Sequence, residues 1–180
     1  YAFTIKGVDF GDAPDSYGTL DASAGASHAV IDGYRLGAAE DEEADGQPSP
    51  TATGDDLAGT PDDEDGVVFV NGPSIPACST NVPLTVPLTN TAGLATARLD
   101  AWIDFNLNGV FDHPAEHLFG GTSATLGAGS NSLLFNVPCT AVAGTTYARF
   151  RLSSTGGLLP TGGKAADGEV EDYALTTLPV

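Results

Sequence analysis

Residues 96–112 have the sequence TARLDAWIDFNLNGVFD, in which an alternating segment runs into a short acidic one. Apolar side chains recur at every second position, at Leu99, Ala101, Ile103 and Phe105. Alternation with a period of two is typical of a β-strand that buries one face. The stretch is therefore predicted to form a β-strand that ends in an acidic loop.

The acidic segment has the spacing of a loop that binds a hard cation. Counted from Asp104, side chains with oxygen occupy positions 1, 3, 5 and 9, and glycine occupies position 6. In calcium-binding loops such oxygens point inward, glycine permits the sharp turn, and position 7 contributes its backbone carbonyl. An EF-hand has a bidentate Glu at position 12, whereas this chain has Ala115 there and Glu116 one residue later.

The predicted calcium ligands in this loop are Asp104, Asn106, Asn108, Asp112, the backbone carbonyl of Val110, and Glu116. A strand before the loop and His113-Pro114 after it argue against the two helices of an EF-hand. Oxygen ligands without any soft ligand favour Ca²⁺. The alternative is an Asx/Gly turn that binds no ion.

The length and composition predict one domain built from strands. The 180 residues suffice for a domain of ordinary size, and a hydrophobic content of 41% suffices for a core. The 23 Gly and 12 Pro residues are typical of short strands joined by turns. No apolar run approaches the roughly 18 residues of a membrane span, so no span is expected. Met is absent, so we expect a processed product or a piece of a longer protein.

The chain is strongly acidic, with 24 acidic and 6 basic residues and a formal net charge of −18. Nucleic acid is therefore not expected as a partner, because binding it depends on Lys and Arg. Eleven acids lie between Glu40 and Asp65, and no Lys or Arg occurs from Leu36 to Ala97. Such self-repulsion opposes compaction. The segment is either a solvated insertion or a set of carboxylates neutralised by bound cations.

Further calcium ligands are predicted among these acids and among others elsewhere in the chain. Carboxylates brought together without a counter-ion repel each other, and some would have to protonate. A divalent cation with oxygen ligands resolves the repulsion, so we expect at least one further Ca²⁺ site that links distant segments. Its candidate ligands are Asp9, Asp12, Glu40, Asp41, Asp62, Asp63, Asp65, Glu169, Glu171 and Asp172.

The two cysteines, Cys78 and Cys139, are predicted to form a disulfide. They are an even pair without a Cys/His metal pattern, which indicates an oxidising, extracytoplasmic setting. The alternative is a pair of buried free thiols.

Five more segments have the periodicity or composition of strands. They are residues 67–70, 82–88, 132–137, 145–152 and 170–177, and residues 28–36 are predicted to form a hairpin around Asp32-Gly33. Pro83 and Pro87 indicate that 82–88 is an edge or bulged strand. Arg149 and Arg151 lie opposite the apolar face of 145–152, where either could stack on Trp102 or pair with a carboxylate.

Seven or eight short strands predict an all-β fold, namely an antiparallel β-sandwich of jelly-roll or immunoglobulin-like type. Long acidic calcium-binding loops are expected to connect its strands. Residues 1–65 are expected to form an acidic, loop-rich segment that packs on a sandwich made by residues 66–180. The two parts are expected to form one structural unit.

The segment Gly168-Glu169-Val170-Glu171-Asp172-Tyr173 resembles the motif from which the GEVED domain family takes its name. Residues 102–106 and 146–152 resemble the same family. Residues 9–19, 25–28, 45–48 and 63–67 resemble the stretch that commonly precedes it.

The resemblance implies a β-sandwich module of large secreted or surface-attached bacterial proteins, often adhesin-like, without enzymatic activity. It also implies that Asn108 stands where Asp is common in such loops, which would weaken the calcium site by one charge.

The expected function is that of a calcium-stabilised extracellular structural or adhesive module of a bacterial surface or matrix protein. Neighbouring domains, copies of the same chain and glycans are the expected partners. One form of this prediction is a filament subunit whose residues 1–8 add to the sheet of the next subunit; the alternative is that they form the first strand of their own sandwich.

The alternative function is a calcium-dependent carbohydrate-binding, lectin-like module. An enzyme is not expected, because the sequence has no nucleophile elbow, His-rich metal motif or Cys/His pairing.

Overall fold

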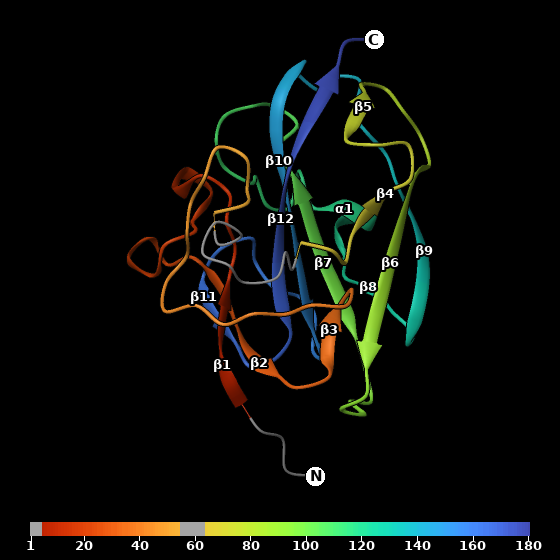
Figure 1. Ribbon diagram of the computed structural model, residues 1–180. Helices are drawn as coiled ribbons and strands as arrows, with labels where there is room; N and C mark the ends of the chain where they lie inside the picture. Colours follow the sequence, from red (N-terminus) through yellow and green to blue (C-terminus); the bar gives the residue numbers. More distant parts are fainter. Residues whose placement is uncertain (1–4, 55–63) are drawn as a thin grey trace.

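The computed structural model describes residues 5–54 and 64–180, and almost all regular structure in this part of the chain is β-strand (Figure 1). The strands are β1 (Ile5–Phe10), β2 (Ala26–Ile31), β3 (Tyr34–Leu36), β4 (Val68–Phe69), β5 (Ser74–Pro76), β6 (Val82–Asn90), β7 (Arg98–Ile103), β8 (Ala124–Thr125), β9 (Gly129–Phe135), β10 (Gly144–Ser153), β11 (Gly163–Ala165) and β12 (Glu169–Leu178). One helical turn, α1 (Leu118–Gly121), precedes β8, and two 3₁₀ turns (Asp15–Tyr17 and Asp21–Ser23) separate β1 from β2. The all-β prediction is confirmed.

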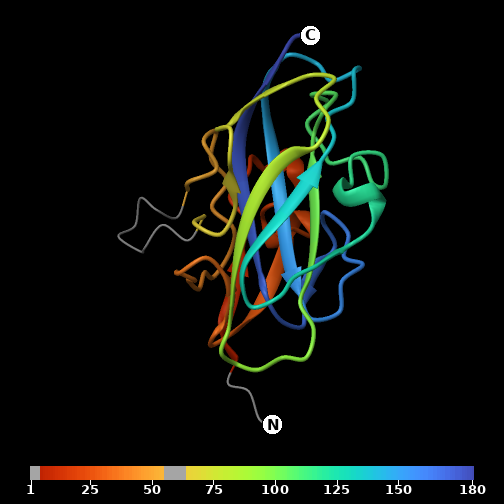
Figure 2. The same cartoon turned by 90° about the vertical axis from the view of Figure 1, so that its right-hand side faces the viewer.

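Two sheets pack face to face and enclose the main hydrophobic core. One has the strand order β5-β12-β10-β7-β8; in the other, β6 pairs with β9 along one edge and with β3 and β4 along the other edge. Figure 2 shows β6 and β9 in front of β10 and β12. Leu99, Ala101 and Ile103 of β7 are fully buried in this core, as their alternation predicts.

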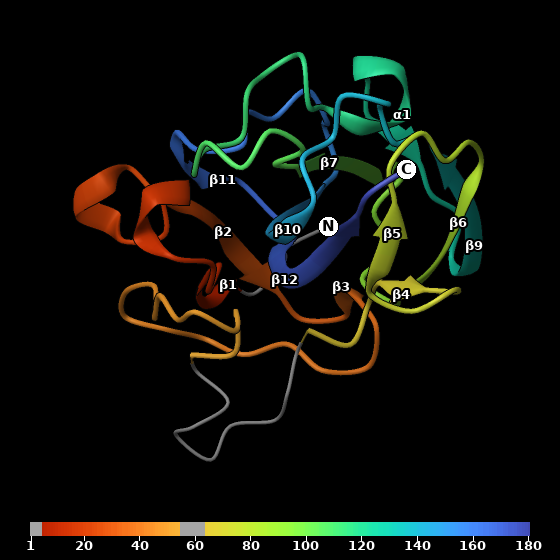
Figure 3. The same cartoon turned by 90° about the horizontal axis from the view of Figure 1, so that it is seen from above.

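A third layer covers the opposite face of the five-stranded sheet (Figure 3). In it, β2 lies between β1, which is antiparallel to it, and β11, which is parallel to it. Trp102 of β7 points toward this layer and packs with Ala13, Tyr17 and Phe111 in a second apolar cluster. Trp102 is fully buried, so the sheet has apolar contacts on both faces.

The N-terminal third of the chain is therefore shared between the layers. β3 belongs to the sandwich, where Leu36 lies opposite Leu88 of β6. β11, from the C-terminal half, completes the outer sheet, where Lys164 lies opposite Ser27 of β2. The expected division at residue 65 does not separate one sheet from another.

The predicted hairpin over residues 28–36 is wrong in its pairing. Asp32 and Gly33 do form a turn between β2 and β3, and Gly33 has the positive φ of 78° that such a turn needs. The two strands nevertheless enter different sheets, because both edges of β2 are occupied by β1 and β11. For residues 5–10 the pairing is within the chain, with Val8 opposite Ala29.

The prolines of β6 do not place it at an edge, since it has neighbours on both sides. The carbonyl of Pro83 accepts a hydrogen bond from the N–H of Val70 (3.3 Å), and that of Pro87 accepts one from Gly37 (2.9 Å). In an antiparallel strand the N and the carbonyl of one residue point to the same side. The missing N–H groups therefore face the side where only the short strands β3 and β4 pair, and the ladder to β9 remains intact.

No helix of the described residues is long and apolar enough to cross a membrane.

Candidate metal centre

The predicted calcium loop begins where β7 ends, at the edge between the five-stranded sheet and the N-terminal layer. Asp104 is fully buried, and its N–H bonds the carbonyl of Tyr147 on β10 (3.2 Å). Gly109, at position 6 of the loop, has a φ of 86°. That value lies in the left-handed region that glycine adopts without strain, so the residue permits the turn the spacing requires.

The first half of the loop is wound around the Asp104 carboxylate. Its Oδ1 accepts the N–H of Asn108 (3.3 Å), and its Oδ2 accepts the N–H of Gly109 (2.9 Å) and the hydroxyl of Tyr17 (2.7 Å). The Oδ1 of Asn106 accepts the N–H of Asn108 (2.9 Å), and the Oδ1 of Asn108 accepts that of Val110 (3.0 Å). These bonds bring the side chains at positions 1, 3 and 5 to the same side of the backbone.

The second half of the loop returns two further carboxylates to the first half. Asp112 Oδ2 accepts hydrogen bonds from the side-chain amides of Asn106 (2.8 Å) and Asn108 (2.9 Å). Glu116 Oε1 accepts the backbone N–H of Phe105 (2.8 Å) and the side-chain amide of Asn106 (3.1 Å). All five predicted side chains thus belong to one hydrogen-bond network, including Glu116, which stands one position later than in an EF-hand.

Burial and like charge make this network electrostatically costly. Burial raises the pKa of Glu116 above its usual value, the neighbouring Asp104 carboxylate raises it further, and backbone N–H donors counteract part of the effect. Burial and the bond to Asp104 raise the pKa of the Tyr17 hydroxyl far above its ordinary value, so Tyr17 remains a donor. A cation placed among these oxygens would relieve the repulsion.

The other acids proposed as ligands lie at several separate places, and many accept backbone N–H groups. Asp12 Oδ2 accepts the N–H of Gly54 (2.7 Å), and Asp65 Oδ1 accepts that of Ala38 (2.9 Å). Glu40 lies 3.6 Å from the guanidinium of Arg35. These contacts attach the long connection between β3 and β4 to the rest of the chain. Asp62 and Asp63 lie outside the described residues.

The three acids of β12 are buried and point to two sides of the strand. Glu169 accepts the N–H of Leu36, and Glu171 accepts the N–H of Gly66 (2.8 Å) and the hydroxyl of Tyr173 (3.0 Å).

Asp172 points to the opposite side, where it forms an ion pair with Arg149 (2.7 Å). Of the two arrangements considered for the arginines, Arg149 pairs with a carboxylate, and its guanidinium lies 5.5 Å from the ring centre of Phe111. The ring that stacks on Trp102 is that of His117, with centres 4.7 Å apart.

One group of acids does come together, and it includes Glu43, which was not among the predicted ligands. Asp9 and Asp41, both proposed as ligands, meet Glu43, and one oxygen of each lies within 4.8 Å of the others. Glu43 stands two residues after Asp41, so in an extended segment both side chains point the same way. Because residues 40–43 are all acidic, the sequence did not single out this pair.

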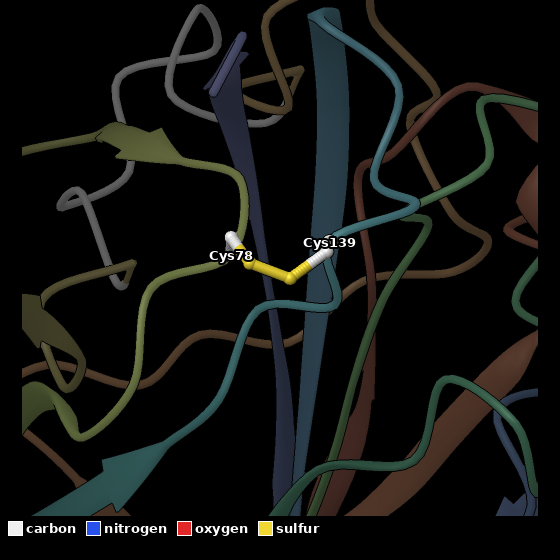
Figure 4. Close-up of a disulfide and its surroundings, with 2 residues drawn as sticks. All are labelled: Cys78 and Cys139. Atoms are coloured by element: carbon white, nitrogen blue, oxygen red, sulfur yellow. A yellow bond between two sulfur atoms is a disulfide. The ribbon is translucent and has the colours of Figure 1, made fainter.

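The predicted disulfide is confirmed. Cys78, after β5, is bonded to Cys139, after β9, and the two are 61 residues apart in the chain (Figure 4). Because β5 and β9 belong to different sheets, the bond joins the two halves of the sandwich. Neighbouring backbone bonds run beside it, such as that from Val137 N–H to the Ser79 carbonyl (2.8 Å).

Comparison with family models matches residues 98–176 to the GEVED domain. The match runs from the start of β7 into β12, so it contains the candidate calcium loop and the 168–173 motif. Comparisons with curated proteins and with solved structures found no match. The family resemblance predicted from the sequence is confirmed over these residues.

Proposed function

We infer the function from two premises: the chain carries a GEVED domain at residues 98–176, and a loop in that domain gathers five oxygen-bearing side chains. The proposed function is that of a calcium-stabilised extracellular structural or adhesive module of a bacterial surface or matrix protein. Calcium here is a structural ion, and no catalytic step is proposed.

The observation that carries the proposal is the hydrogen-bond network of the loop. Asp104, Asp112 and Glu116 supply carboxylate oxygens, and a half-turn of the Asn106 or Asn108 amide exchanges its nitrogen for its nearly isosteric oxygen. Such a set consists only of the hard oxygen ligands that Ca²⁺ prefers. Binding would replace like-charge repulsion by attraction without moving the backbone far.

The position of the loop explains how an ion bound there would stabilise the whole module. Asp104 directly follows β7 of the five-stranded sheet and accepts a hydrogen bond from the Tyr17 hydroxyl of the N-terminal layer. Phe105, the next residue, lies in the sandwich core. A bound ion would therefore hold together the point at which all three layers meet.

The extracellular setting is supported by the disulfide and by the GEVED domain, both of which are consistent with a secreted protein. Free calcium is abundant outside cells, and a structural site does not need the tight affinity of an intracellular buffer. The net charge of −18 would itself attract divalent cations.

The proposal is tested by measuring calcium binding and thermal stability of the chain with Asp104→Asn. Asparagine retains the shape and one acceptor oxygen for Tyr17 and Gly109 but removes the charge. Calcium at a hundredfold excess over its dissociation constant should stabilise the unaltered protein by about 2.7 kcal/mol. Asp104→Asn should reduce that gain, whereas Asp21→Asn, at an exposed position, should leave it unchanged.

Two results would contradict the proposal. One is a melting temperature that does not respond to calcium or EDTA in the unaltered protein. The other is a calcium response in Asp104→Asn equal to that of the Asp21→Asn control.

A glycan-binding function is the second candidate, and one observation favours it. A groove of about 640 Å³ lies between α1 and β9 and shares Phe105 and Glu116 with the edge of the loop. Ligand pockets in proteins commonly have this size. The test is binding to a glycan array. Binding that is lost in EDTA and in Leu133→Glu, a variant in the wall of the groove, would support this function. An array on which no glycan binds in a calcium-dependent way would oppose it.

Neighbouring domains or copies of the chain are the proposed partners of a structural module. In the filament form of the proposal, residues 1–8 add to the sheet of the next subunit. Because β1 pairs with β2 within the chain, such an exchange would have to open this ladder. Native mass spectrometry distinguishes a ladder of oligomers from a single chain mass, and a single mass at all concentrations would exclude the filament.

A further inference from the structure

Three carboxylates meet at a place outside the GEVED domain and far along the chain from the 104–116 loop. Asp9 belongs to β1, and Asp41 and Glu43 belong to the connection that follows β3. One oxygen of each side chain lies within 4.8 Å of the other two. Within residues 5–54 and 64–180 this is the one group of three or more acidic, His or Cys side chains that converges so closely.

Hydrogen bonds that involve the backbone hold Asp9 and Glu43 in place. The N–H of Glu43 bonds the carbonyl of Val8 (2.8 Å), and the N–H of Phe10 bonds Glu43 Oε2 (2.8 Å). Asp9 Oδ2 accepts the N–H of Val170 on β12 (2.6 Å). The acidic connection therefore runs alongside β1, and Asp9 and Glu43 cannot separate without breaking these bonds.

Three carboxylate oxygens of Asp41 and Glu43 are buried without a hydrogen-bond donor among the described residues. Asp41 is only 9% exposed, and both of its oxygens are buried and accept no hydrogen bond from the described residues. The same is true of Glu43 Oε1. No arginine or histidine of the described residues forms an ion pair with Asp41 or Glu43. A buried carboxylate without a donor is costly, so the arrangement requires a bound proton or a bound cation.

We propose that Asp9, Asp41 and Glu43 bind a calcium ion that fastens the acidic connection to β1. Calcium–oxygen distances are about 2.4 Å, so two ligands on opposite sides of one ion are about 4.8 Å apart. The three oxygens therefore fit on one coordination sphere. The ligands are all carboxylates, which favours Ca²⁺ over softer transition metals.

Three carboxylates this close repel one another when all are ionised. A divalent cation would supply positive charge at this place and keep the carboxylates ionised at neutral pH. A shared proton is the competing solution, and the two make different predictions for calcium stoichiometry.

The site would give the acidic connection a structural role. Residues 37–54 contain few apolar side chains, so little hydrophobic burial holds them in place. An ion shared by β1 and this segment would attach it to the outer sheet and, through Asp9, to β12.

The test is the number of calcium ions bound per chain, measured by equilibrium dialysis at neutral pH. Glu43→Gln removes one charged ligand but keeps an oxygen that can accept the Phe10 N–H. It should bind one ion fewer than the unaltered protein at a calcium concentration that saturates the latter, and Asp41→Asn should do the same. Glu42→Gln, at the exposed position between them, should bind the full number.

Two further results separate this site from the loop. Asp104→Asn alone should bind one ion fewer, because it removes the ion of the loop. The double variant Asp104→Asn/Glu43→Gln should bind two ions fewer. If Asp104→Asn loses none while Glu43→Gln loses one, this inference stands and the proposed loop site fails.

The proposal is overturned if Glu43→Gln and Asp41→Asn both bind as many ions as the unaltered protein. A shared proton produces that result, and glutamine, which resembles a protonated glutamate, would then preserve the structure. Limited proteolysis gives a second measurement. Removing calcium from the Asp104→Asn protein should expose residues 37–54 to cleavage, and unchanged cleavage would also oppose the site.

Discussion

Replacing Arg149 by leucine is expected to destabilise the fold more than any exposed substitution, because the residue is a buried charge at the centre of the molecule. Its side chain is 0% exposed and forms a bidentate ion pair with Asp172, with distances of 2.8 and 2.7 Å. It also bonds the carbonyl oxygens of Tyr17, Gly18 and Pro160 and the hydroxyl of Thr19. One guanidinium thus joins β10, β12, the 15–19 turn and the 156–163 loop.

The size of the effect follows from what Arg149→Leu leaves behind. Asp172 would remain fully buried, with the N–H of Ala13 (2.8 Å) as its one other donor among the described residues. Removing one partner of a buried ion pair typically costs about 3–5 kcal/mol. The free energy of unfolding of a protein is typically about 5–15 kcal/mol, so the variant would be near the limit of stability. The folded-to-unfolded ratio should fall by roughly two to three and a half orders of magnitude.

Urea unfolding followed by fluorescence measures this effect, since Trp102 is the single tryptophan and is fully buried. Arg98→Leu, which makes the same chemical change at a partly exposed position, should cost about 1 kcal/mol or less. The double variant Arg149→Leu/Asp172→Leu should lose less unfolding free energy than the two single variants together, because it leaves neither charge unpaired. A loss below about 1 kcal/mol in Arg149→Leu would refute the reasoning.

Three further changes test separate features of the structure. Tyr17→Phe removes the hydroxyl donor to Asp104 and should cost about 1.5–3 kcal/mol in urea unfolding, as expected for a bond to a charged group. Replacing both Cys78 and Cys139 by serine should cost about 4 kcal/mol in the loop-entropy model, and unchanged unfolding would show that the bond constrains little. Burial and nearby arginines lower the pKa of His28 well below its usual value, so below pH 6.5 the unfolded chain binds a proton that the folded chain does not. Stability should therefore fall as the pH drops below 6.5, and this fall should be missing from His28→Gln when the pH profiles of the two proteins are compared.

The strands were predictable from the sequence because their burial pattern is local. Leu99, Ala101 and Ile103 alternate, and all three are fully buried in the sandwich core. The same alternation suggests that the opposite face meets solvent, yet Trp102 and Arg149 on that face are also fully buried. A period of two identifies one apolar face but cannot show that another layer covers the second face.

The loop and the carboxylate cluster also differ in whether their residues are close together in the sequence. The five side chains from Asp104 to Glu116 belong to one short segment of the sequence, so their spacing alone predicts that they converge. Asp9 and Glu43 meet only because the acidic connection runs along β1, and that path depends on backbone hydrogen bonds between distant segments. Likewise, the pairing of Arg149 with Asp172 follows from the register of β10 and β12, which the sequence does not reveal.

The attachment of the N-terminal layer to β12 has a consequence for how the protein is made. The bond from Val170 to Asp9 spans 161 residues, and that from Ala13 to Asp172 spans 159. Contacts of such high contact order form slowly, and a strand synthesised early cannot complete them until β12 has emerged. During that interval the unfinished chain is exposed to other chains, and strong mutual repulsion between acidic copies would keep them from associating before the fold closes.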